Sequence, residues 1–283
     1  MRRRGVLSAV VVALVALGLS VAFVPAGSAE TSPHYYVALG DSLSRGYMPG
    51  VGDSDQGYAD DLFATLQARD PSLQLVKLGC SGETTGTMIN GGKCTDRYPV
   101  GTSQLDVAEQ FLRDHRGEVT YLTLDIGAND VDNCASAGSI DPVCVTNGLA
   151  TIVQNLDTIL AGLTQASGRL PRLIGMNYYD PFLQQWLTGP QGQLVAAASV
   201  TLLEGLNTAE SAEYVLYGWR VADVATAFHS LDFINKRSAP PYGLVPQNVA
   251  YICNYTFMCS QLNIHANVAG YQLIADAFAK HIG

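Results

Sequence analysis

Residues 35–46 read YYVALGDSLSRG, and this stretch predicts a buried strand followed by a tight turn. Its first five residues are apolar without polar alternation, which is typical of a strand covered on both faces in a parallel sheet. The run stops at Gly40-Asp41-Ser42, so Ser42 is expected just past the carboxyl end of the strand. Ligands bind at that edge of open α/β sheets. The sequence therefore predicts a hydroxyl at the ligand-binding edge, although a serine in a turn often serves only the turn.

Outward from this stretch, strand-like apolar runs alternate with amphipathic segments. We expect helices at 57–69, 104–116, 147–166, 193–212 and 268–281, and further strands at 73–78, 119–126, 173–176 and 214–221. Such alternation predicts a parallel sheet covered by helices on both faces, with right-handed crossovers. Two segments, 130–146 and 228–262, are expected to be long irregular loops that overhang the same edge as Ser42. Loops of this length in a compact domain are usually functional.

The start of the chain has the pattern of a secretory signal peptide. Residues 2–4 are arginines, residues 6–24 are apolar, and residues 27–29 are small enough for cleavage. A retained membrane anchor is the alternative, and the cleavage pattern disfavours it. We therefore expect a signal peptide at 1–29 and a single domain at 30–283, in a secreted, extracellular protein with no stable membrane insertion.

The charge balance limits the partners of the chain. It has 283 residues with 16 basic and 25 acidic side chains, a formal net charge of −9, and the three arginines near the start belong to the predicted signal peptide. An acidic surface repels nucleic acid and anionic membranes. Neither is expected as a partner, and we expect the protein to be a monomer.

All six cysteines follow the predicted signal peptide, an arrangement typical of three disulfides in an oxidising compartment. Fifteen pairings are possible, and proximity along the chain favours Cys80 with Cys94, Cys134 with Cys144, and Cys253 with Cys259. Zinc binding is the competing use of cysteine, but the chain has no C-x-x-C pair. We expect no bound metal.

Three further fragments lie where chemistry is expected. Gly82 belongs to CSGET at 80–84, after the second strand, and Asn129 belongs to GAND at 127–130, after the third. His265 belongs to NIHAN at 263–267, just before the last helix. Taken singly, a turn glycine and a turn asparagine are ordinary.

Together with Gly40-Asp41-Ser42-Leu43, these fragments resemble, in order, the four sequence blocks of the GDSL, or SGNH, family of serine hydrolases. The resemblance implies a three-layer α/β/α sandwich with a flavodoxin-like, five-stranded parallel sheet. It also implies a carboxylic ester hydrolase, an esterase or lipase, that needs no cofactor. Ser42 would be the nucleophile and His265 its base, while the amides of Ser42 and Gly82 and the side chain of Asn129 would hold the oxyanion.

The chain departs from the family pattern at Leu262. Family members usually have an aspartate three residues before the histidine, which holds the imidazole in the required tautomer. We favour a backbone carbonyl in this role, and Asn263 or a distant carboxylate such as Asp232 stays open. Among the other histidines, His229 is the one serious rival to His265 as the base, because it lies near a long segment.

The substrate is the least defined expectation. Aromatic residues in the loops favour a lipid or aryl ester, that is, a small-molecule or lipid substrate; they are Tyr178, Tyr179, Phe182, Trp186, Phe233, Tyr242, Tyr255 and Phe257. One alternative is a carbohydrate (acetyl) esterase. Another is a non-catalytic carbohydrate- or lipid-binding protein on the same fold, which would tolerate the loss of Ser42 or His265. A nucleophile-elbow hydrolase is disfavoured, since no G-x-S-x-G occurs.

Overall fold

The computed structural model describes residues 34–136, 139–169 and 171–282, and Ser32–Gly283 forms one compact unit. At its centre lies a five-stranded sheet with the order β2-β1-β3-β6-β7, all of whose pairings are parallel. The strands are β1 His34–Gly40, β2 Leu73–Lys77, β3 Val119–Asp125, β6 Arg172–Met176 and β7 Arg220–Ala222. Numbered within the sheet, this order is 2-1-3-4-5, the flavodoxin-like arrangement. The predicted α/β class and sheet are therefore confirmed.

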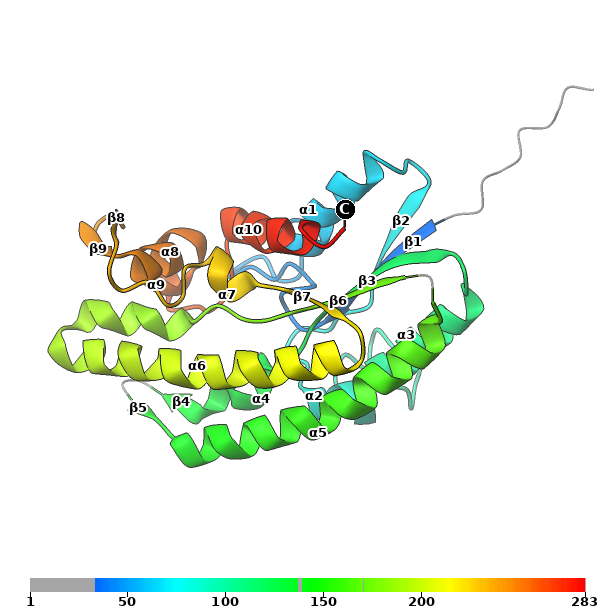
Figure 1. The fold of residues 1–283 in the computed structure, drawn as a ribbon, viewed down its shortest axis with the longest axis horizontal. Helices are drawn as coiled ribbons and strands as arrows, with labels where there is room; N and C mark the ends of the chain where they lie inside the picture. The colour runs from blue at the N-terminus through cyan, green and yellow to red at the C-terminus, as the bar shows by residue number, and fades with distance from the viewer. Residues whose placement is uncertain (1–33, 137–138, 170, 283) are drawn as a thin grey trace, which may run out of the picture. The chain divides into compact units, whose positions relative to one another are not determined.

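Helices cover both faces of the sheet, as Figure 1 shows. One layer consists of α1 Tyr58–Gln67, α7 Val224–Ala227 and α10 Val268–Ala279. The other consists of α2 Thr85–Asn90, α3 Gln104–Asp114, α5 Pro142–Ser167 and α6 Pro190–Leu216. The predicted three-layer sandwich is confirmed, and its two longest helices, α5 and α6, lie side by side in one layer.

Strand β1 pairs with β2 on one side and with β3 on the other, and both of its faces are covered. Tyr36, Val37, Ala38 and Leu39 have no exposed surface. At the end of the strand, Gly40 pairs with Asp125 of β3 and has a φ of +128°. A Cβ atom there would lie 2.0 Å from the Asp125 carbonyl oxygen, so only glycine fits. This close approach brings the chain into the Ser42 turn.

Two expected boundaries are wrong. The run 214–221 is not a strand, because residues 214–216 form the last turn of α6 and only Arg220–Ala222 pairs as β7. The Tyr214 ring packs against β6 so closely that a Cβ on Gly175 would lie 2.2 Å from it. Helix α5 starts at Pro142 rather than at 147, because the Asp141 side chain accepts the N–H groups of Val143 and Cys144.

The two segments expected to be irregular contain short elements instead. The first contains α4 Ala128–Val131, a 3-10 turn at Asp132–Cys134, and the strand pair β4 Ala135–Ser136 and β5 Ser139–Ile140. The second contains β8 Lys236–Ser238, β9 Leu244–Pro246, α8 Gln247–Tyr255 and α9 Met258–Gln261. A further 3-10 helix, η2 Pro181–Thr188, precedes α6. Elements this short leave too little periodicity for the sequence to predict them.

The three predicted disulfides are confirmed: Cys80 with Cys94, Cys134 with Cys144, and Cys253 with Cys259. Each closes a loop of 6 to 14 residues beyond the sheet. Within the described ranges, no helix has both the length and the apolar character needed to cross a bilayer. The predicted signal peptide at 1–29 lies outside the described residues.

Candidate active site

Ser42 lies in a turn that two buried carboxylates hold in place. The Asp41 N–H donates to both the backbone oxygen and the Oδ2 of Asp125, at 3.0 and 3.1 Å. The Asp41 carboxylate in turn accepts the N–H of Leu43 at 2.9 Å. Burial raises the pKa of Asp41 to about 6, and burial together with the Asp41 charge raises the pKa of Asp125 well above its usual range. The turn is therefore anchored to β3, and its hydroxyl is held at the carboxyl edge.

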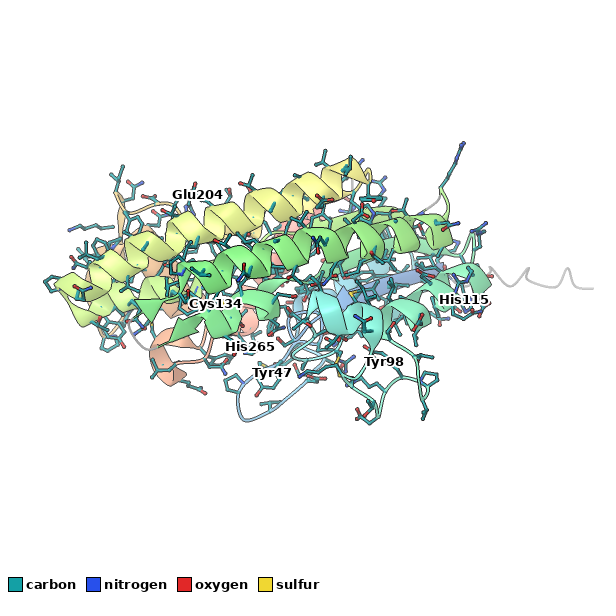
Figure 2. The ribbon with its side chains drawn as sticks, turned by 90° about the horizontal axis from the view of Figure 1, so that it is seen from below. Tyr47, Tyr98, His115, Cys134, Glu204 and His265 are labelled. Carbon is teal, nitrogen blue, oxygen red and sulfur yellow. A yellow bond between two sulfur atoms is a disulfide. The ribbon has the colours of Figure 1, made fainter. Side chains whose placement is uncertain are left out.

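His265 meets Ser42 from the other end of the chain, with its Nε2 atom 2.8 Å from Ser42 Oγ. The histidine lies between α9 and α10, where its carbonyl accepts the Phe257 N–H at 2.9 Å. The ring of Tyr47 packs on the imidazole with centroids 4.5 Å apart. Figure 2 labels both residues, which lie near each other. The two residues singled out as nucleophile and base thus lie within hydrogen-bonding distance, as a nucleophile and its base require.

Asn263, not a backbone carbonyl, contacts the far side of the imidazole. Its Oδ1 atom lies 2.8 Å from His265 Nδ1 and accepts the His265 backbone N–H at 3.1 Å. Our preference for a backbone carbonyl is therefore wrong. Asp232 is excluded as well, because its carboxylate accepts hydrogen bonds from Ile234 and Asn235.

The turn at Leu262 explains why the usual position is not used. Leu262 ends α9 in a left-handed conformation with φ +51°, and 74% of its surface is exposed. The chain then folds back so that the Asn263 side chain caps the His265 N–H, an Asx-turn. An asparagine two residues before the histidine thereby reaches the atom that an aspartate three residues before it contacts in the usual family pattern.

Burial also controls the charge of the base. Desolvation by burial lowers the pKa of His265 to about 4, and among the described residues no carboxylate is hydrogen-bonded to the ring to offset it. The imidazole is therefore neutral at neutral pH. A neutral imidazole next to a serine hydroxyl can accept its proton.

The turns after β1, β2 and β3 carry three hydrogen-bond donors, and two of their residues, Ser42 and Asn129, line one cavity with His265. In the described part of the chain, the backbone N–H groups of Ser42 and Gly82 have no acceptor. Asn129 Nδ2 donates to the Glu83 backbone oxygen at 2.9 Å and to Asp41 Oδ2 at 3.3 Å. These are the three donors that the resemblance implied.

The turns that carry Gly82 and Asn129 are tied together. Gly82 has φ +79°, so the turn after β2 needs a residue without a side chain. One turn later, the Thr85 backbone N–H and hydroxyl donate to the Asp130 carboxylate at 2.8 and 2.6 Å. Because Asp130 directly follows Asn129, these bonds hold α4 against the start of α2.

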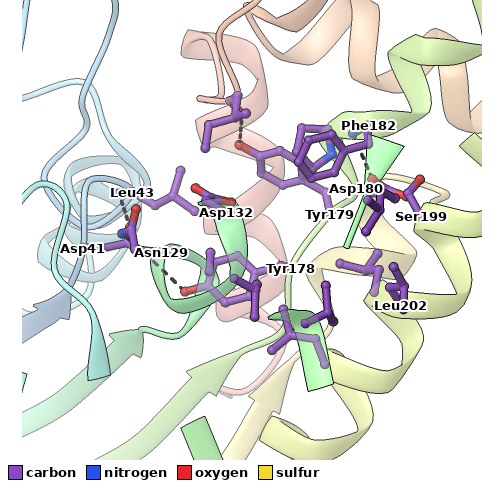
Figure 3. A pocket seen from close by; sticks show the side chains of 18 of the residues that line it. Asp41, Leu43, Asn129, Asp132, Tyr178, Tyr179, Asp180, Phe182, Ser199 and Leu202 are labelled. Atoms are coloured by element: carbon purple, nitrogen blue, oxygen red, sulfur yellow. Dashed lines mark hydrogen bonds between the residues drawn. The ribbon is translucent and has the colours of Figure 1, made fainter. Parts of the chain in front are cut away.

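A cavity opens from Ser42 and His265 into the layer of α5 and α6 (Figure 3). Most of its wall is aliphatic, with Val145 and Leu149 from α5 and Leu202, Leu203 and Leu206 from α6. Of the eight aromatic residues expected to line a pocket, Tyr178, Tyr179 and Phe182 do so, whereas Trp186, Phe233, Tyr242, Tyr255 and Phe257 do not. Sequence reasoning missed the aliphatic wall, because Leu149 fits the core stripe of its helix and Val145 falls in a segment that we expected to be irregular.

His229 does not lie at this cavity. It lines a separate groove with Asp232 and packs against Tyr251 with ring centroids 4.4 Å apart. It has no hydrogen bond to Ser42 in the described residues. The rival to His265 is therefore removed.

One further residue of the cavity was not anticipated. Asp132, three residues after Asn129, lines the same cavity as Ser42 and His265. Burial, followed by the nearby Asp41 charge, raises the pKa of Asp132 to about 7. The sequence signal was the spacing Asn129-x-x-Asp132, which places both residues on one face of a helical turn.

Comparisons with known proteins show the family and agree with the fold. The profile of the GDSL-like lipase/acylhydrolase family matches residues 38–273, so the chain belongs to that family and is a carboxylic ester hydrolase. An extracellular lipase from Streptomyces rimosus has 17% identity and a TM-score of 0.55, over 88% of this chain and 99% of that one. A GDSL-like lipase from Parabacteroides merdae has 12% identity and a TM-score of 0.54, over 88% and 94%. No curated protein sequence matches the chain.

Proposed function

We propose that the protein hydrolyses carboxylic esters through an acyl-enzyme on Ser42. The observation that carries the proposal is the 2.8 Å separation of Ser42 Oγ and His265 Nε2 at the mouth of an apolar cavity. His265 takes the hydroxyl proton while Oγ attacks the ester carbonyl carbon, and it then gives that proton to the leaving alkoxide. Water, deprotonated by His265, attacks the acyl-enzyme and releases the acid and the free serine.

The charge that develops on the carbonyl oxygen has donors at hand. The surrounding turns already hold the N–H groups of Ser42 and Gly82, and the Glu83 carbonyl anchors the Asn129 amide, whose second N–H exchanges Asp41 Oδ2 for the oxyanion. Such preorganised donors stabilise an oxyanion more than a ground-state carbonyl. This supports assigning all three to the oxyanion hole.

The acyl group enters the cavity between α5 and α6. Its aliphatic wall supports esters of apolar acids, lipid or aryl, as the substrate class. An acetyl group would leave most of that wall unused, so the carbohydrate (acetyl) esterase is the second choice. The non-catalytic alternative gains no support, since both Ser42 and His265 are present and in contact.

Export is part of the same proposal. The signal-peptide pattern at 1–29 and three disulfides support a protein that works in an oxidising extracellular space. The likeness to an extracellular lipase is in keeping with this. The proposal also includes that the protein is a monomer and that nucleic acid is not its partner.

The deciding experiment is a chain-length series of 4-nitrophenyl esters, from acetate to palmitate, with the mature protein. We expect kcat/KM to rise from acetate to longer chains and Ser42→Ala to abolish hydrolysis with the fold intact. His265→Ala should do the same, while His229→Ala, from the separate groove, should keep the parental rate. A maximum at acetate would favour the acetyl esterase. Full activity in folded Ser42→Ala would end the proposal.

A further inference from the structure

Asp132 differs from the other two acidic residues of the cavity that adjoins Ser42, because Asp41 and Asp180 accept hydrogen bonds from the protein. The wall around it is mainly aliphatic and aromatic, and Figure 3 shows the carboxyl group between Leu43 and Tyr179, close to Asn129. In the described residues, no group donates a hydrogen bond to this carboxyl group, and no lysine or arginine lines the cavity. A desolvated carboxylate without a partner is costly, so the fold does not explain why an acid occupies this position.

The backbone holds Asp132 in place. Its N–H donates to the Ala128 carbonyl as α4 ends, and the disulfide of Cys134 fixes the turn that follows. Asn129 and Asp132 are three residues apart on this helical segment, so their side chains lie on the same face. The Asp132 backbone lies about 4.5 Å farther along the helix axis than that of Asn129, which marks the site of the ester carbonyl oxygen, and both side chains line the cavity.

We propose that Asp132 determines acyl specificity by binding a hydrogen-bond donor, a hydroxyl or an ammonium group, on the acyl chain close to the ester carbonyl. This inference rests on the proposed function, because it takes Ser42 and Asn129 as the reference points for the ester. A donor on the substrate makes the hydrogen bond to Asp132 that no described group of the protein makes. A carboxylate without that partner disfavours an apolar or anionic group at the same place.

The direction of the effect follows from charge. A hydrogen bond to an ionised group favours a substrate by roughly 10- to 100-fold in binding. Burial raises the pKa of Asp132 to about 7, so the carboxylate forms as the pH rises through neutrality. Attraction for an ammonium group should rise over the same range. Asp41, Tyr178, Tyr179, Asp180 and His265 also face the cavity, so the pH effect must be read against a variant that lacks only the Asp132 charge.

The test uses four ethyl esters that share a short acyl chain and differ in its substituent. They are ethyl 3-methylbutanoate, ethyl 3-hydroxybutanoate, ethyl 3-aminobutanoate as its ammonium form, and ethyl 3-carboxybutanoate as its anion. Acid release by the mature protein is followed at constant pH, and kcat/KM is compared within each variant. We expect the hydroxy and ammonium esters to exceed the methyl ester by tenfold or more, and the anion to be the poorest.

The variants separate hydrogen bonding from charge. Asp132→Asn keeps an acceptor oxygen, so it should retain part of the hydroxyl preference but lose most of the ammonium preference and its rise with pH. Asp132→Leu should invert the order in favour of the methyl ester. Asp96→Asn, on an exposed loop, is the matched control and should keep the parental order. Melting curves establish that each variant is folded.

The outcomes are distinct. If none of the four esters nor any nitrophenyl ester is hydrolysed, the proposed function itself fails. If esters are hydrolysed but the substituent order is the same in the parent, Asp132→Asn and Asp132→Leu, only the role of Asp132 fails. A preference for ammonium alone, lost in Asp132→Asn, would show that the bound donor is cationic. A preference for hydroxyl that survives in Asp132→Asn would show a neutral donor.

Discussion

The Asn263 side-chain oxygen faces two nitrogens of His265, the backbone N at 3.1 Å and the ring Nδ1 at 2.8 Å. A backbone N–H can only donate, so the oxygen of the carboxamide, and not its NH₂ group, lies on this side. That oxygen can only accept, and therefore Nδ1 carries the ring proton. The lone pair of Nε2 then points at Ser42 Oγ, 2.8 Å away. An uncharged side chain sets the tautomer that an aspartate sets in a serine triad.

Asn263→Ala should accordingly lower kcat with little change in KM. The loss of one orienting hydrogen bond, worth about 1–2 kcal/mol, corresponds to a fall of roughly 5- to 30-fold. Asp232→Asn is the control and should stay within about tenfold of the parent, because its carboxylate serves only its own loop. An Asn263→Ala protein that is folded and fully active would show that the imidazole needs no side chain to orient it.

The pH dependence of kcat/KM should reflect the buried base. Only neutral His265 accepts the serine proton, and burial lowers its pKa to about 4. Activity should therefore persist well below pH 6.5 and fall as the pH drops through about 4. Asn263→Asp places a charge beside Nδ1, which raises the pKa and should shift this limb upward. Asp132→Asn separates the titration of Asp132 from that of the histidine. An unshifted limb in Asn263→Asp would contradict the assignment of His265.

Much of the fold and of the site follows from local sequence. The uninterrupted apolar run before Ser42 predicts a doubly covered strand, and β1 is completely buried from Tyr36 to Leu39. The short spacing within each cysteine pair predicts the three bridges correctly. The turn fragments around Gly82 and Asn129 lie beside Ser42, because parallel strands bring their carboxyl ends to one edge.

What could not be predicted depends on longer-range packing or on turn geometry. Tyr214 reads as part of a strand, since a short apolar run fits either period, but it lies in the last turns of α6 and packs on Gly175. The left-handed Leu262 decides that Asn263 turns back onto His265. The importance of Asp132 depends on the apolar wall that α5 and α6 build around it, and α6 is distant from Asp132 in sequence.

Loss of the disulfides should lower stability in the order of loop length. In the chain-entropy treatment, the bridge between Cys80 and Cys94 contributes about 3 kcal/mol and the shorter one between Cys253 and Cys259 about 2 kcal/mol. The double Ser variants should therefore both melt below the parent, the first at the lower temperature. Mass spectrometry of the alkylated, unreduced protein should find no modified cysteine. Six alkylated cysteines in active protein would contradict a structural role for the bridges.

Asn129→Ala should depress kcat far more than it raises KM. The Nδ2 group is already oriented by the Glu83 carbonyl at 2.9 Å, so it acts as a fixed donor for charge that appears only in the transition state. Removing one such donor lowers turnover by about 10²- to 10³-fold.

The matched control for this change is Asn155→Ala. Its Nδ2 donates to Thr85 Oγ1 at 2.9 Å, and Asn155 is also partly buried, but it is not among the residues that line the Ser42 cavity. Asn155→Ala should cost on the order of 1 kcal/mol of stability and leave kcat close to that of the parent. If Asn129→Ala raised KM alone, Asn129 would be a binding residue. If both variants lost turnover equally, the contact of α2 with α4 and α5, rather than a donor to the oxyanion, would be the cause.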